Sequence, residues 1–260
     1  MLQRTVDLPF PIDLHRTLSG VRRGTHDPTC RFDDSGAWRA SRSPAGPVTL
    51  RLVSHGDHVE ATAWGEGAEA ALDAVPSLIG CHDDASEFDP AHPVVARLWR
   101  DFSDVRIPRS GAVTETLINV VLEQRVTTFE ARRAQSQLVQ RWSEPAPGLG
   151  DLMLPPDPEV IAGVAYYDLH VIGVERARAD TVRRVAASAR RLEALTVLPP
   201  AEATQRLTHG LATGDSSCGG GWMWLDHATH QGAKAVGLSA STGAIAEGLA
   251  ADFLLVDLNV

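Results

Sequence analysis

The hydrophobic pattern of this chain changes its period near residue 110, and this change constrains the fold more than any other feature. Before that point, β-forming residues cluster in 48–53 and 58–63 around His55-Gly56-Asp57, which is typical of a hairpin. The segment Ala68–Ile79 has apolar residues at helical spacing, so one helix is expected there. Beyond residue 110 the spacing becomes helical. The pattern therefore predicts an α+β fold in which a small antiparallel sheet domain precedes a mostly helical domain.

Capping residues predict where several helices of the second part begin. Thr127 and Glu130 have the spacing of a capping box, so two helices separated by a tight turn are expected around them. Asp157-Pro158 predicts the N-cap of a short helix, a longer helix is expected over Glu175–Glu193, and another opens at Pro199-Pro200. The residues expected on the apolar helix faces are Leu117, Val120, Val121, Gln124, Ala131, Ala134, Leu138, Trp142, Val182, Val185, Ala186, Ala189 and Leu192.

Composition and charge narrow the functional class. No apolar run approaches the roughly 20 residues of a membrane span, which predicts a chain outside the membrane and a cytoplasmic location. The net charge of −9 argues against nonspecific coating of nucleic acid. The segment Glu175–Arg191 is nevertheless rich in arginine and contains only Glu175 and Asp180 as acids. It is either a phosphate-facing surface or an ordinary solvated helix face.

Metal-ligating residues form no strong pattern. Cys30, Cys81 and Cys218 are dispersed and have no C-x-x-C spacing, which predicts structural thiols rather than a disulfide framework or a zinc site. His227 and His230 could share one helix face as metal ligands, or they could be exposed histidines on a terminal helix. No metal and no cofactor are therefore expected.

Four stretches of the chain carry a family resemblance: Leu8–Leu14, Phe88–Pro93, Val121–Thr127 and Gly173–Thr181. On these residues, the segment 8–208 resembles the 3-methyladenine DNA glycosylase II group of the helix-hairpin-helix base-excision glycosylases. The resemblance implies hydrolysis of N-glycosidic bonds to alkylated bases in double-stranded DNA, as part of base-excision repair, and association with the nucleoid when bound to DNA. It also implies a sheet domain over 1–85 and a truncated helical domain over 86–209.

Such an enzyme extrudes a base from the duplex, which costs a few kcal/mol of stacking and requires a residue that fills the gap. The resemblance places Gln124, Arg125 and Thr127 in the turn that contacts DNA, with Arg125 at the intruding position. The alternative for Arg125 is an ordinary surface residue in a turn. Arg183 and Arg184 are expected to face DNA phosphates.

The extruded base also needs a pocket. Tyr166, Tyr167 and His170 stand where the family has an aromatic segment, so the resemblance implies that their rings stack on an electron-poor alkylated base. The alternative is that these aromatic residues only pack the protein interior.

The resemblance ends at a seam near His209. The family's next segments, a hairpin of the type L-P-G-V-G-P-W-T-A and a later G-D-Y-H that supplies the catalytic aspartate, have no counterpart here. Catalysis is therefore expected to be impaired. Asp215 is a weak candidate for a substitute carboxylate, and a solvated aspartate in a Gly-Ser loop is the alternative.

The last segment, 210–260, resembles the C-terminal end of a metal-dependent amidohydrolase through Thr213–Ser217, Ala228–Leu238 and Gly243–Asp257. This resemblance predicts a foreign helix-plus-strands tail. The segment lacks the histidines and the barrel that such a hydrolase needs. Two alternatives to the glycosylase-like repair protein thus stay open: a noncatalytic DNA-binding or damage-sensing module, and a metal-dependent amidohydrolase fragment. The oligomeric state is left open.

Overall fold

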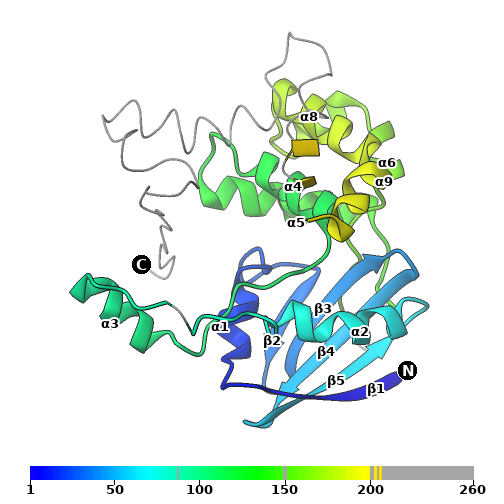
Figure 1. Ribbon diagram of the computed structural model, residues 1–260. Coiled ribbons are helices and arrows are strands. Elements are labelled where there is room, and N and C mark those ends of the chain that lie inside the picture. Colours follow the sequence, from blue (N-terminus) through cyan, green and yellow to red (C-terminus); the bar gives the residue numbers. More distant parts are fainter. Residues whose placement is uncertain (87, 149–150, 200–201, 204, 207–260) are drawn as a thin grey trace. The chain divides into compact units, whose positions relative to one another are not determined.

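The computed structural model describes residues 1–86, 88–148, 151–199, 202–203 and 205–206 (Figure 1). The chain divides into two compact units, Met1–Thr196 and Val197–Val260. The sheet and the helices α1–α9 all belong to the first unit. The expected tail, with Asp215, Cys218, His227 and His230, lies outside the described residues. Of the helix expected after Pro199, residues 202–203 and 205–206 are described and are helical. The domain limits at 85/86 and 209/210 stay predictions.

Five strands form one antiparallel sheet in the order β1-β5-β4-β3-β2. The strands are β1 (Leu2–Asp7), β2 (Cys30–Asp33), β3 (Gly36–Ser43), β4 (Gly46–Ser54) and β5 (His58–Trp64). The helices are α1 (Leu14–Ser19), α2 (Ala68–Leu78), α3 (Pro93–Asp101), α4 (Val113–Leu122), α5 (Thr128–Trp142), α6 (Pro158–Gly163), α7 (Tyr166–Val171), α8 (Arg176–Ala187) and α9 (Ala189–Glu193), followed by a 3-10 turn at Ala194–Val197. The α+β class expected from the sequence is confirmed.

The expected hairpin connects β4 and β5. The two strands pair antiparallel with Ser54 opposite Val59, and the backbone N–H of His55 donates to the His58 carbonyl at 2.9 Å. Gly56 has φ of +91°, a left-handed conformation that glycine adopts without steric cost. The turn chemistry therefore sets the register of the central strands.

One face of the sheet packs against α1 and α2. Figure 1 shows α2 lying along this face, and its Leu72 and Val75 are buried there. Because side chains alternate across a strand, the same strands also present residues to the opposite face. There Trp38 stacks on Trp64 with ring centroids 5.5 Å apart, and Leu152 packs against them. Both faces of the sheet are thus covered by apolar groups within the first unit.

Local capping signals give the helix starts correctly. Thr127 is the N-cap of α5 in a complete capping box with Glu130, and Asp157 is the N-cap of α6 with Pro158 at its first position. The single long helix expected over Glu175–Glu193 is wrong in one respect, because it is broken at Ser188 into α8 and α9.

One further expectation needs correction. Val120 was expected on the apolar face of α4 but is 42% exposed, while its neighbours Ile118 and Leu122 are buried. A helix that the sequence pattern did not indicate, α3, begins at Pro93 and is capped by the His92 ring, which accepts from the Val94 N–H at 3.3 Å. None of the described helices is both long enough and apolar enough to cross a membrane.

An ion pair joins the sheet to α4. Arg39 of β3 is 8% exposed and donates through Nη2 to both carboxylate oxygens of Glu115, at 3.0 and 3.2 Å. Both side chains are largely removed from water, so each charge depends on the other for compensation. A second link is made by the buried Asp27, whose Oδ1 accepts from the Gln135 side chain of α5 at 3.4 Å. The helices α4 and α5 are therefore anchored to the N-terminal sheet through polar contacts.

We expect Glu115→Ala to lower the free energy of unfolding by about 3 kcal/mol, because it leaves the Arg39 guanidinium buried without its partner. The matched control is Asp101→Ala, which breaks the exposed Arg97–Asp101 pair on α3. That loss should stay below about 1 kcal/mol. Urea unfolding followed by circular dichroism measures both, and equal losses would contradict the role assigned to the buried pair.

Candidate nucleic-acid interface

The turn between α4 and α5 presents an exposed arginine in a strained conformation. α5 begins at Thr128, as the capping box predicted, but α4 already ends at Leu122, so Gln124, expected on its apolar face, lies in the turn. Arg125 has φ of +55° and is the one non-glycine residue with positive φ among the described residues. This region costs an L-residue about 1–2 kcal/mol and is found mainly where the surrounding structure enforces it. Arg125 is therefore an exposed residue in a tight turn between two helices.

The capping box fixes the second half of this turn. Glu130 accepts hydrogen bonds from the backbone N–H of Thr127 at 2.9 Å and from its hydroxyl at 2.8 Å. Thr127 in return accepts from the Glu130 N–H at 3.3 Å. The Thr127 N–H, and then its hydroxyl, lower the pKa of the Glu130 carboxyl. Thr127 was expected to contact DNA, but its hydroxyl is already hydrogen-bonded to the Glu130 carboxylate.

A buried guanidinium holds the first half of the turn. Arg178 is 7% exposed and donates to the carbonyl of Leu122 at 3.0 Å and to the carbonyl of Gly173 at 3.1 Å. The first carbonyl is the end of α4, and the second lies in the turn between α7 and α8. The expectation that the arginines of this stretch point outward is wrong for Arg178, because its charge satisfies backbone carbonyls in the interior.

Two of the three expected pocket residues lie together. The Tyr166 hydroxyl is 3.4 Å from Nδ1 of His170, and their ring centroids are 5.6 Å apart. The Arg176 guanidinium lies 5.1 Å from the Tyr166 ring centroid, a cation–π distance that the sequence analysis did not anticipate. Tyr167, by contrast, is 69% exposed. The aromatic cluster therefore consists of Tyr166, His170 and Arg176.

The two arginines expected to face phosphates differ in environment. Arg183 is half-buried, and its Nε donates to the Ala162 carbonyl of α6 at 3.4 Å. Arg184 is exposed and donates to the Thr181 hydroxyl at 3.2 Å. Of this pair, Arg184 has the more open guanidinium.

Several carboxylates near the turn are already engaged. Glu130 belongs to the capping box. Glu123 pairs with Arg23 at 3.4 Å, Glu175 with Arg178 at 3.7 Å, and Asp180 with Arg176 at 3.9 Å and Arg183 at 3.8 Å. These groups are held as ion pairs or caps, so they are poor candidates for a free carboxylate that could stabilise a cationic sugar.

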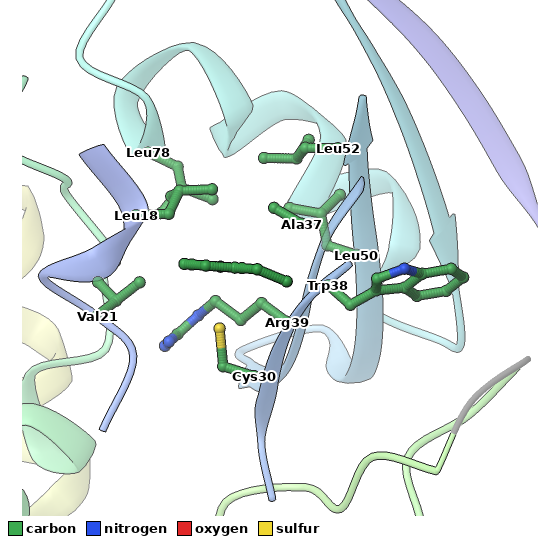
Figure 2. A pocket seen from close by; sticks show the side chains of 10 residues that line it. Leu18, Val21, Cys30, Ala37, Trp38, Arg39, Leu50, Leu52 and Leu78 are labelled. Atoms are coloured by element: carbon green, nitrogen blue, oxygen red, sulfur yellow. The ribbon is translucent and has the colours of Figure 1, made fainter. Parts of the chain in front are cut away.

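A cavity lies in the sheet part of the chain and not at the turn (Figure 2). Its volume is about 10 Å³, near the minimum for one water molecule. Figure 2 shows the Cys30 thiol beside the Arg39 side chain. Burial raises the pKa of Cys30 to about 12, so the thiol stays protonated and unreactive near neutral pH. Within the described residues, no three His, Cys, Asp or Glu side chains are grouped so that they could hold a metal ion.

Comparison with protein-family models gives no match, and comparison with curated proteins gives none either. Solved structures do match. A 3-methyladenine DNA glycosylase from Archaeoglobus fulgidus is 16% identical with a TM-score of 0.64, over 79% of this chain and 73% of that one. MBOgg1 in complex with a low-affinity DNA ligand is 14% identical with a TM-score of 0.56, over 80% and 68%.

A third structure is the 8-oxoguanine glycosylase/lyase of Clostridium acetobutylicum, in complex with double-stranded DNA containing cytosine opposite 8-oxoG. It is 11% identical with a TM-score of 0.56, over 78% of this chain and 69% of that one. At these identities the likeness concerns the fold. This chain therefore has the fold of the DNA glycosylases, which confirms the resemblance of residues 8–208 seen in the sequence. The resemblance of 210–260 to amidohydrolases stays a prediction.

Replacing Thr127 by alanine should remove the cap of α5 and cost about 1 kcal/mol of stability at neutral pH. The Glu130 pKa should then rise part of the way toward its ordinary value, because the backbone N–H of residue 127 remains a donor while the hydroxyl is lost, and carboxyl NMR titration detects the rise. Because the folded-state pKa is lowered, this stabilisation is present above the unfolded pKa and is lost as pH falls through the folded one. The difference between wild type and variant should therefore shrink in acid. Thr181→Ala, which removes an exposed hydroxyl within α8, is the control and should show no such pH dependence.

Arg178→Met should lower the free energy of unfolding by about 3 kcal/mol, because the carbonyls of Leu122 and Gly173 lose their donor. Amide exchange in the turn 123–127 should accelerate in parallel. Arg184→Met, at an exposed position of the same helix, should change stability by no more than about 0.5 kcal/mol. If both variants unfold at the same urea concentration, Arg178 does not hold the turn.

Proposed function

We propose that this chain binds double-stranded DNA at alkylated bases and fills the space of an extruded nucleotide with Arg125, as a glycosylase-like protein of base-excision repair. The observation that carries the proposal is the exposed, left-handed Arg125 at the tip of the α4–α5 turn in a glycosylase fold. Strained backbone conformations of this kind cluster at functional sites, and a residue that inserts into a partner is one such case. Two of the similar structures are themselves complexes with DNA, which supports the same partner here. Gln124, beside Arg125 in the turn, would contact the same strand.

The extruded base would stack on the cluster of Tyr166, His170 and Arg176. An alkylated purine is electron-poor, and the face of a tyrosine ring attracts such a group. Arg176 lies over the Tyr166 ring at 5.1 Å, so an incoming base would compete with its guanidinium for that ring. The exposed Arg184 would bind phosphate, whereas Arg183 would have to release the Ala162 carbonyl first.

We infer that base release by this chain is slow or absent. The carboxylates near the turn are engaged in caps and ion pairs, and the family's aspartate segment has no counterpart in the sequence. A carboxylate that stabilises a cationic sugar must be charged and face the reacting carbon. Asp215 is the weak candidate for that role. A chain that binds the lesion without cleaving it would act as a damage-sensing module, which is the second candidate function.

Base release decides between these two candidates. We would measure free 3-methyladenine and 7-methylguanine from alkylated DNA, with a chelator present. Release at the spontaneous rate by a folded, DNA-binding protein is the expected result. Release above that rate, lost in Asp215→Asn, would assign catalysis to Asp215. Stoichiometric zinc retained through dialysis would instead favour the amidohydrolase fragment.

Arg125→Gly is expected to change stability and DNA binding in opposite directions. Glycine adopts positive φ freely, so the variant should gain up to about 1 kcal/mol of unfolding free energy. Its preference for a duplex with a tetrahydrofuran abasic analogue over an intact duplex should fall about tenfold, in line with the loss of one stacking group. Fluorescence anisotropy measures the binding, and Arg97→Ala on α3 is the control for removal of an exposed arginine. A wild-type chain that binds neither duplex would overturn the proposed function.

A further inference from the structure

Phe129 is a large aromatic side chain that the fold does not use. It is the second residue of α5, between the two capping-box residues Thr127 and Glu130, and it is 75% exposed. An exposed ring of this size forgoes the stabilisation that burial would give. Lone exposed apolar residues are common, so exposure alone does not define a site. Its surroundings make the difference.

Two arginines lie one helical turn after Phe129. Arg132 and Arg133 follow it at i+3 and i+4, the positions that share a helix face with residue i, and both are exposed. The Arg132 side chain lies against Gly24, since a Cβ built at Gly24 would be 2.8 Å from its Cδ. The Arg132 side chain therefore packs against the α1–β2 loop. The three residues Phe129, Arg132 and Arg133 are called the α5 patch below.

The α1–β2 loop is itself fixed beside α5. Asp27 accepts from the backbone N–H of Arg23 at 2.6 Å and from the Gln135 side chain of α5 at 3.4 Å. Arg23 also reaches Glu123 at 3.4 Å, just before the α4–α5 turn. The loop, the turn and the first turns of α5 thus form one connected surface within the first unit.

The charge on this surface is unbalanced toward positive. The Glu130 carboxylate is directed to Thr127 in the capping box, and Glu123 is paired with Arg23. Neither acid is left to neutralise Arg132 or Arg133. A solvated helix face would explain two arginines but not an unburied phenyl ring between them and the turn. An aromatic ring beside cations is the combination that binds a nucleic acid with an unstacked base, because the ring stacks on the base and the cations bind phosphates.

We propose that the α5 patch binds the DNA strand opposite the extruded nucleotide. Phe129 stacks on the base that has lost its partner, and Arg132 and Arg133 bind phosphates of that strand. The inference rests on the proposed function, because Arg125 lies in the turn just before α5 and Phe129, four residues later, lies in the first turn of α5, and both are exposed. Arg125 then fills the gap in one strand while Phe129 holds the widowed base in the other. Because Phe129 can stack only on an unpaired base, the α5 patch makes DNA binding depend on an open base pair.

The test uses the full chain and a duplex in which 2-aminopurine stands opposite a tetrahydrofuran abasic analogue. Wild type should bind this duplex more tightly than the intact one and quench the 2-aminopurine fluorescence by stacking. Phe129→Ala should bind it about tenfold more weakly and lose the quenching, with affinity for intact duplex unchanged. Phe102→Ala, at another exposed phenylalanine that is the C-cap of α3, is the matched control and should behave as wild type.

The arginines should give a different signature. Arg132→Gln with Arg133→Gln should weaken binding to both duplexes alike and reduce the salt slope of the affinity by about 2, as expected for the loss of two phosphate contacts. Phe129→Trp should retain or strengthen the quenching, and it keeps the test valid if the alanine variant does not fold.

The roles of Arg125 and of the α5 patch are distinguished by different results. If wild type prefers the abasic duplex and Phe129→Ala does too, the α5 patch is refuted while the role of Arg125 stands. If wild type binds no DNA, both proposals fall.

Discussion

The buried guanidinium of Arg178 is the interaction on which the candidate interface depends. Removing such a charge from water costs several kcal/mol, and this cost is offset only if its N–H groups are well bonded. Arg178 donates to the carbonyls of Leu122 and Gly173, which are the last residue of α4 and the turn before α8. A cation at a helix C-terminus also interacts favourably with the helix dipole. The end of α4 is thereby fixed, and with it the conformation that forces Arg125 into the left-handed region.

The other end of α4 is held in a complementary way. α4 has no side-chain N-cap of its own, and the carboxylate of Glu193 in α9 accepts from the N–H groups of Val113 and Thr114 at 3.1 and 2.8 Å. A carboxylate at the N-terminus and a guanidinium at the C-terminus both oppose the helix dipole. Both come from residues more than fifty positions later in the sequence. The helix before the turn is thus clamped by α8 and α9, which explains how a short helix can support a strained loop.

The distance over which an interaction acts decides what the sequence could predict. The β4–β5 hairpin, the capping box at Thr127 and the Asp157 cap follow from neighbouring residues, and the structure confirms them. Arg178 was expected to point outward with the other arginines of its stretch, toward phosphate or solvent, and only the fold brings two carbonyls to it. The α4–α5 turn itself was predictable, but the left-handed backbone of Arg125 was not, since arginine has no preference for that region.

The negative net charge of the chain bears on the proposed recognition of DNA. With −9 overall, the chain repels a duplex at long range, and this repulsion is screened beyond roughly 10 Å at moderate salt. Attraction to DNA must then come from short segments whose acidic side chains are held in ion pairs or caps within the protein. Glu123 and Glu130 beside the turn are held in this way. A site of this kind gains little from nonspecific phosphate contacts and more from stacking, which is available only where a base pair is open. Weak binding to intact duplex is therefore the physical condition under which Arg125 and Phe129 could discriminate a damaged site.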